Sequence, residues 1–180
     1  LQIVREAILN FKNRDKSKVL IPQLKSKATV GYSTNAIIKQ LDKVVNAQID
    51  ETGTVKPLVD CIKSGAIRGI AGVVGCNNAS GVSNLAHTTI MKELIKNDIL
   101  VVTTGCGASA AAKFGLMEKE AAKTLAGKGL GAVCELVDIP PVLHMGSCVD
   151  CSRILEVASA VANFVDMDIS DLPVVGVAPE

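Results

Sequence analysis

From residue 67 onward, short apolar runs alternate with longer stretches in which apolar residues recur at helical spacing. The short runs predict buried strands at 67–74, 99–103, 141–144 and 174–177. The stretches between them predict helices. Strands and helices that alternate at this spacing form right-handed crossovers and a parallel sheet. The sequence therefore predicts an α/β protein, with a three-layer Rossmann-like fold and a mainly parallel sheet.

The first third of the chain has a less regular pattern. Residues 1–14 predict an amphipathic helix, because the following apolar residues share one face: Ile3, Val4, Ala7, Ile8 and Phe11. A proline near its start and a glycine after its end predict a short helix at 57–64. We assign residues 1–65 to an N-terminal helical and strand segment, which could close a preceding domain. Residues 66–180 form the Rossmann-like domain, which we expect to be incomplete at its C-terminus.

The composition narrows the classes of function. The net charge is +1 and aromatic residues make up 2% of the chain, so neither a basic surface nor stacking platforms for nucleic acid are expected. No apolar run approaches the roughly 18 residues of a transmembrane segment. No secretory signal opens the chain, and we expect a cytoplasmic protein. In a reducing compartment, six cysteines indicate metal ligands, catalytic groups or buried apolar residues rather than disulfides.

Three of the cysteines stand just beyond predicted strands. Cys76, Cys106 and Cys148 follow the runs that end at residues 74, 103 and 144. The carboxyl ends of parallel strands meet at one edge, where open α/β sheets bind ligands, so we expect the three thiols to converge. Thiolates bind soft metals and iron–sulfur clusters, and helix N-termini stabilise their charge. From position alone, the three are either ligands of one metal centre or buried strand-end cysteines.

The other cysteines carry weaker signals. Cys61 and Cys134 lie among apolar residues of predicted helices, which favours a place in the core. Cys151 forms a C-x-x-C pattern with Cys148, which is typical of a redox pair or half a zinc site, but no second such pattern exists. Gly105-Cys106-Gly107 resembles half of a dinucleotide-binding fingerprint and lacks its third glycine, so a nicotinamide cofactor is weakly supported.

Three segments of the chain resemble the catalytic subunit of anaerobic nickel–iron carbon monoxide dehydrogenases: IRGIAGVVGCNN (67–78), KELIKNDILVVTTGCGASAAAKFGLM (92–117) and PPVLHMGSCVDCSRIL (140–155). Weaker similarity in 31–41 and 56–65 extends the match over nearly the whole chain. The resemblance implies that Cys76, Cys106 and Cys148 are ligands of a nickel–iron–sulfur cluster of the Ni-4Fe-4S type. At this cluster the family converts CO and water to CO2, two protons and two electrons.

The same resemblance implies a larger enzyme. The remaining cluster ligands of the family, one histidine and two cysteines, are expected upstream of residue 1, and a family lysine is expected after residue 180. Additional 4Fe-4S clusters would also lie outside this segment. We therefore expect the cluster-binding domain at 66–180 to have the remainder of its own subunit as partner. The full enzyme is expected to be a homodimer that passes electrons to a ferredoxin-like acceptor.

Within the chain, the resemblance implies no catalytic residue beyond the three metal ligands, and we expect the 180-residue chain alone to have no CO oxidation activity. Two alternatives remain. The hybrid-cluster-protein family has a similar layout of three cysteines, although the long matching segments favour the dehydrogenase. The chain could also be a non-catalytic Rossmann-like module whose cysteines are core residues.

Overall fold

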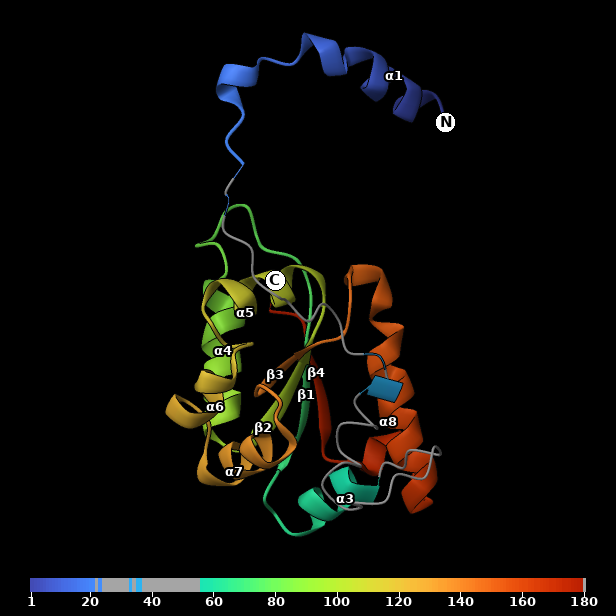
Figure 1. Ribbon diagram of the computed structural model, residues 1–180. Helices are drawn as coiled ribbons and strands as arrows, with labels where there is room; N and C mark the ends of the chain where they lie inside the picture. The colour runs from blue at the N-terminus through green and yellow to red at the C-terminus, as the bar shows by residue number, and fades with distance from the viewer. Residues whose placement is uncertain (22, 24–32, 34, 37–55, 180) are drawn as a thin grey trace.

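The computed structural model of the protein describes residues 1–21, 23, 33, 35–36 and 56–179. Its centre is a sheet of four parallel strands in the order β3-β2-β1-β4 (Figure 1). The strands are β1 (Gly69–Val73), β2 (Ile99–Thr103), β3 (Val142–His144) and β4 (Val174–Val177). Each lies within or at a strand predicted from the apolar runs, so the predicted α/β class with a parallel sheet is confirmed.

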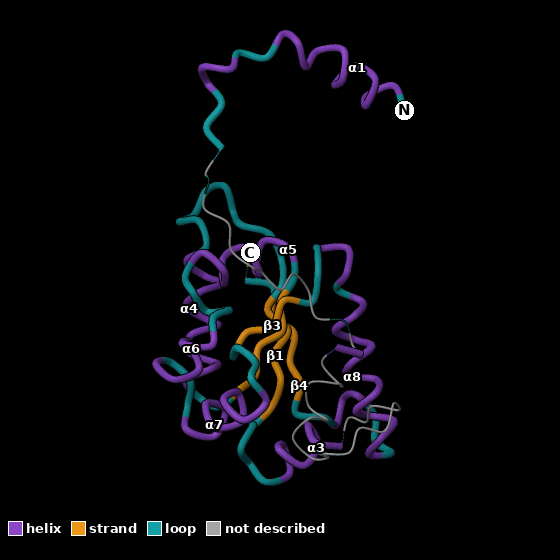
Figure 2. The backbone as a smooth tube through the Cα atoms, viewed as in Figure 1, coloured by secondary structure: helices purple, strands orange, loops and turns teal. Residues whose placement is uncertain are grey.

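Helices cover both faces of the sheet (Figure 2). One side carries α4 (Leu85–Lys96), α5 (Gly105–Lys113), α6 (Lys119–Thr124) and α7 (Lys128–Val137). The other side carries α3 (Lys56–Lys63) and α8 (Ser152–Val165). The remaining described helices are α1 (Gln2–Asn10) and the 3-10 turns η1 (Phe11–Asn13), η2 (Lys16–Lys18), η3 (Cys148–Asp150) and η4 (Ile169–Asp171). The arrangement is the expected three-layer sandwich.

The order of the strands creates a switch point beside β1. The chain steps outward from β1 to β2 and β3, then crosses back through α8 and adds β4 on the other side of β1. In open parallel sheets, the crevice at such a reversal, outside the carboxyl ends of the strands, is the usual place for a ligand. Cys76 lies just after β1 at this edge.

The core forms because the central strands are buried on both faces. Val73 and Val101 are fully buried, which explains why β1 and β2 read as continuous apolar runs. On α4, the side that packs on the sheet consists of His87, Met91 and Ile95, spaced one helical turn apart. Leu85 is 55% exposed, because it is the first residue of the helix and lies off this stripe.

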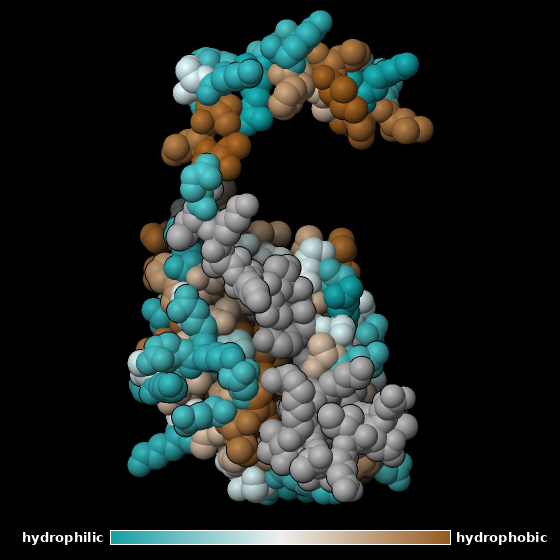
Figure 3. Space-filling model, in the orientation of Figure 1, coloured by the Kyte–Doolittle hydropathy of each residue, from teal (hydrophilic) through white to brown (hydrophobic). Residues whose placement is uncertain are grey.

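The N-terminal amphipathic helix forms as predicted, but none of its residues is buried. Figure 1 shows α1 apart from the sheet, and Figure 3 shows apolar side chains uncovered on it. Ile3 is 85% exposed and Phe11 is 67% exposed. Among the described residues, no helix has both the length and the apolarity that crossing a membrane requires. Most of the structure expected between α1 and α3 lies outside the described residues.

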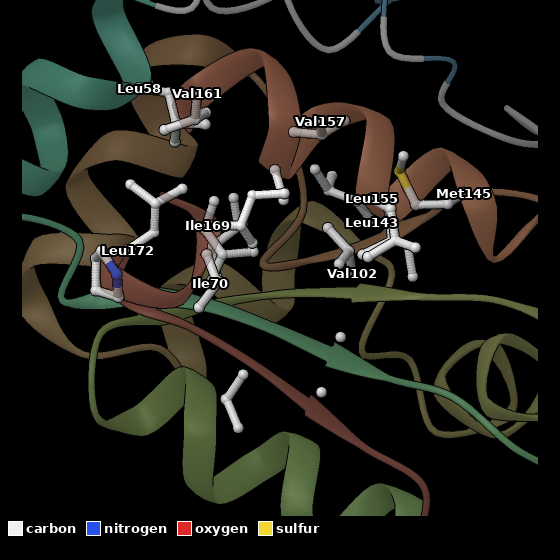
Figure 4. Close-up of a pocket in the computed structure, with 18 of the residues that line it drawn as sticks. Leu58, Ile70, Val102, Leu143, Met145, Leu155, Val157, Val161, Ile169 and Leu172 are labelled. Carbon is white, nitrogen blue, oxygen red and sulfur yellow. The ribbon is translucent and has the colours of Figure 1, made fainter. Parts of the chain in front are cut away.

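An apolar cavity of about 160 Å³ lies between the sheet and α8 (Figure 4). Its walls include Ile70, Val102 and Leu143 of the strands and Val157 and Val161 of α8. All the residues that line it are apolar or glycine. It lacks the few convergent polar groups that orient a substrate, so we interpret it as a packing gap rather than a reaction site.

Two glycines of β1 give a matched test of this packing. A Cβ on Gly72 would lie 3.6 Å from Ile154 Cγ2, an ordinary contact at the wall of the cavity. We expect Gly72→Ala to raise the free energy of unfolding by about 0.5–1 kcal/mol, because alanine restricts the unfolded chain and fills space. A Cβ on Gly69 would lie 2.4 Å from the carbonyl oxygen of Pro173. Gly69→Ala should therefore lower the free energy of unfolding by about 1–3 kcal/mol in urea denaturation.

Candidate metal centre

Three cysteine-bearing turns leave the sheet at one edge. Val73 of β1 is level with Thr103 of β2, and Thr103 is level with His144 of β3. Because the strands are parallel and end level, the turns after them emerge side by side. Cys76 follows β1, Cys106 lies in the first turn of α5, and Cys148 is the first residue of η3.

We call the thiols of Cys76, Cys106 and Cys148 the thiol rim. Within it, the other two thiols affect the pKa of Cys76. The charge of Cys106, followed by a hydrogen bond between the two side chains, raises the pKa of Cys76 above its ordinary value. The charge of Cys148 acts in the same direction. Cys76 and Cys148 are exposed, and Cys106 is half-buried. The structure thus brings the three predicted site residues to one accessible patch.

Gly105 allows the Cys106 and Cys148 turns to touch. Its φ of +55° lies in the left-handed region, and a Cβ there would come within 3.0 Å of Cys148 Cβ. The backbone N–H of Gly105 donates to the carbonyl oxygen of Gly146 over 3.1 Å. The two turns are therefore joined by a hydrogen bond and by a contact that a larger residue at 105 would disturb.

Gly107 presses the start of α5 against the end of β1. A Cβ at this position would lie 2.7 Å from Thr103 Oγ1 and 2.9 Å from the carbonyl oxygen of Val73. Both distances are too short for a real side chain. Glycine therefore lets α5 begin directly over the two strand ends, and Cys106 approaches Cys76 as a result.

Polar side chains tie the strand ends together beneath the thiol rim. The hydroxyl of Thr103 donates to the carbonyl oxygen of Val73 over 2.6 Å. His87 is fully buried, and its Nε2 lies 3.3 Å from the carbonyl oxygen of Val74. The proton is assigned to Nε2, because that nitrogen faces an acceptor. His87 thus ties α4 to the backbone at the end of β1.

Asn77, the residue after Cys76, fastens its loop to α4. Its Oδ1 accepts from the backbone N–H of Asn84 over 2.7 Å, and its Nδ2 donates to Asn84 Oδ1 over 2.9 Å. Asn84 adopts a left-handed conformation, with φ of 68°. Sequence reasoning missed this pair. The available signal was the Asn-Asn that follows Cys76, since asparagine bonds readily to nearby backbone.

Asp150 holds the Cys148 turn in shape. Its carboxylate accepts from the backbone N–H of Ser147 over 2.7 Å and from the Ser147 hydroxyl over 2.8 Å. These bonds, followed by the charge of Arg153, hold the pKa of Asp150 below its ordinary value. Arg153 pairs with Asp150 over 3.2 Å and also donates to the carbonyl oxygen of Met145 over 3.3 Å.

Of the other three cysteines, Cys134 lies in the core as its pattern predicts, whereas Cys61 and Cys151 are only half-buried. Cys134 is buried in the core, and burial raises its pKa to about 12. Cys61 is half-buried and packs against the core. Cys151 lies at the edge of the thiol rim, with its Sγ 3.1 Å from Thr104 Oγ1.

The donor set suits a multi-iron cluster better than a single ion. Among the described residues, no three His, Cys, Asp or Glu side chains meet at a position for one metal ion. In an iron–sulfur cluster each iron takes its own protein ligand, so the thiols spread over a patch as they do here. The residues present fit such a group, although three thiolates need further ligands to complete its shell.

Replacement of Gly107 tests the close approach of α5. Gly107→Ala should lower the free energy of unfolding by about 1–3 kcal/mol, because the new methyl group overlaps Thr103 and Val73. Ser109→Ala, at an exposed position of the same helix, is the control and should change it by less than about 0.5 kcal/mol. Equal stability of the two variants in urea denaturation would contradict the packing described here.

The pH dependence of alkylation tests the proximity of the thiols in the metal-free protein. Only the thiolate reacts, so the midpoint of the rate against pH reports the pKa of Cys76. Because Cys106 raises this pKa, Cys106→Ala should shift the midpoint to lower pH. Cys61→Ala is the matched control and should leave it unchanged. An unchanged midpoint in Cys106→Ala would show that the two thiols lie apart.

Known proteins share this arrangement over almost the entire chain. Carbon monoxide dehydrogenase 1 of Methanosarcina acetivorans is 54% identical over 179 residues, which cover 99% of this chain and 27% of that protein. The nickel-free crystal structure of carbon monoxide dehydrogenase from Thermococcus sp. AM4 is 50% identical and has a TM-score of 0.81, covering 99% of this chain and 27% of that one.

A third similar protein is acetyl-CoA synthase/carbon monoxide dehydrogenase. Its solved structure contains NiZn[Fe4S4] and NiNi[Fe4S4] clusters in the alpha subunits. It is 40% identical, with a TM-score of 0.79, and the match covers 99% of this chain and 27% of that one. The chain thus spans about 27% of the length of the first of these relatives. The Prismane/CO dehydrogenase family matches residues 1–180, and the chain belongs to this family.

Proposed function

We propose that the chain is part of an anaerobic carbon monoxide dehydrogenase, an oxidoreductase that converts CO and water to CO2, two protons and two electrons. Cys76, Cys106 and Cys148 are its ligands to a nickel–iron–sulfur cluster of the Ni-4Fe-4S type. The observation that carries the proposal is the level register of β1, β2 and β3, which brings the turns with Cys76, Cys106 and Cys148 to one edge of the sheet. The turns of Cys106 and Cys148 also approach each other at Gly105. The names of the relatives and the clusters described for one of them support it.

The chain's own part in this reaction is to bind and orient the cluster. The three thiolates would hold one side of the cluster, and Gly105 and Gly107 let the turns that carry them pack closely against one another and against the strand ends. The N-terminus of α5 at Cys106 favours negative charge, which suits a thiolate-bound cluster. When bound, the cluster supplies Lewis-acid chemistry and accepts the two electrons.

The other side of the site belongs to the rest of the enzyme in this proposal. Cys76 and Cys148 are exposed in the chain, so there is room for ligands from elsewhere. On the family resemblance, these are one histidine and two cysteines upstream, with a lysine downstream. Residues 66–180 are the cluster-binding domain and 1–65 the segment before it. The full enzyme in this proposal contains further 4Fe-4S clusters, is a homodimer in the cytoplasm, and passes its electrons to a ferredoxin-like acceptor.

The alternatives are less well supported. A module whose three cysteines are core residues would bury them. In the structure Cys76 and Cys148 are exposed, whereas Cys134, a cysteine of the core, is buried. A hybrid-cluster protein would fit the family as a whole, but the relatives reported above are carbon monoxide dehydrogenases.

Single substitutions in the full-length enzyme test the ligand set. Cys76→Ser, Cys106→Ser and Cys148→Ser should each lose most of the bound nickel and the iron of this one cluster. CO oxidation should fall at least about 100-fold, the upper end of the cost of losing even an outer-shell partner of a metal site. Cys61→Ser is the matched control and should keep both. Metal content by elemental analysis and CO-dependent dye reduction are the measurements. Full metal content in all three rim variants would overturn the proposal.

A further inference from the structure

Thr104 has the position and backbone of a helix cap but does not act as one. It is the N-cap residue of α5, with φ of −137° and ψ of 164°, the extended conformation that such residues adopt. A threonine there normally accepts a hydrogen bond from the second or third N–H of the helix, here Cys106 or Gly107. The side chain of Thr104 makes no such bond.

The hydroxyl of Thr104 is directed to Cys151 instead. Thr104 Oγ1 lies 3.1 Å from Cys151 Sγ, within hydrogen-bond distance for sulfur. Thr104 is only 1% exposed, so its hydroxyl has little access to water and must find a protein partner. Cys151 supplies that partner from the far side of the Cys148 turn.

The first turn of α5, which carries Cys106, therefore has no side-chain cap. The N–H of Gly105 is already bound to the carbonyl oxygen of Gly146. The next two N–H groups, of Cys106 and Gly107, have no side-chain cap. They belong to the turn that carries Cys106, where an anionic ligand would benefit from free donors.

We propose that Cys151 is a positioning residue that holds the Thr104 hydroxyl away from the start of α5, so that the N–H groups of Cys106 and Gly107 remain available to the cluster. This inference rests on the proposed function for the identity of the group that receives them. The contact that holds the Thr104 hydroxyl at Cys151 is present in the chain without any bound group. Without Cys151, the buried hydroxyl would turn to the nearest free donors and cap α5.

Hydrogen exchange in the metal-free full-length protein tests the diversion directly. In Cys151→Ala, the released hydroxyl should cap α5 and slow exchange of the peptide spanning residues 104–113 by about fivefold at the capped amide, the size of a typical N-cap. Thr104→Val keeps the shape of the side chain without the hydroxyl, so the double variant Thr104→Val with Cys151→Ala should show no slowing. Cys61→Ala is the matched control for loss of a thiol.

The midpoint potential of the loaded enzyme tests the consequence for the cluster. Hydrogen bonds to cluster sulfur stabilise the reduced, more negative form. Cys151→Ala should therefore shift the midpoint potential, measured by redox titration with electron paramagnetic resonance, to a lower value. The double variant should return to the potential of Thr104→Val, because no hydroxyl remains to compete.

Three results would overturn the inference: unchanged exchange in Cys151→Ala, an unchanged potential in Cys151→Ala, or a double variant as low in potential as Cys151→Ala. Failure of the proposed function has a separate sign, since Cys106→Ser would then retain its nickel and iron. The exchange measurement needs no metal, so it still tests the diversion in that case.

Discussion

The level, parallel pairing of β1, β2 and β3 is the constraint on which the candidate site depends. The register sets Val73, Thr103 and His144 side by side, so the segments after them must emerge at one edge. Cysteines that are far apart in sequence then meet without any short metal-binding motif. The strand order reverses beside β1, and such a reversal is where open parallel sheets usually bind their ligands.

The polar groups beneath the rim give that edge its shape. Most of the core is apolar, and the buried polar residues of the described chain belong to α4 and the end of β2: Asn84, His87, Thr88, Thr103 and Thr104. Two of them bond to backbone carbonyls at the end of β1, His87 to Val74 and Thr103 to Val73. A buried polar group is costly unless paired, so each bond fixes one arrangement of the turns. The thiols are thus held in place before any ligand binds.

The surface of the chain agrees with a site shared with other parts of a larger protein. Two rim thiols are exposed, and Val149 beside them is 84% exposed. The apolar side of α1 is also uncovered. A chain that spans about 27% of its relatives' length has the remainder of such a protein available to cover both surfaces.

The fold class, the strands and the position of one cysteine after each of three strands could be predicted from the sequence. Buried parallel strands produce unbroken apolar runs, and each of these cysteines follows one. The sequence also distinguished Cys134, which lies in a helix and is buried in the core, from the three cysteines that follow strands. The contacts that hold the turns could not be predicted in this way. The bond from Thr104 to Cys151, the contact of Gly105 with Cys148 and the tether from His87 to Val74 join segments distant in sequence. No local pattern encodes such pairs, since they depend on strand order and on the tilt of the helices.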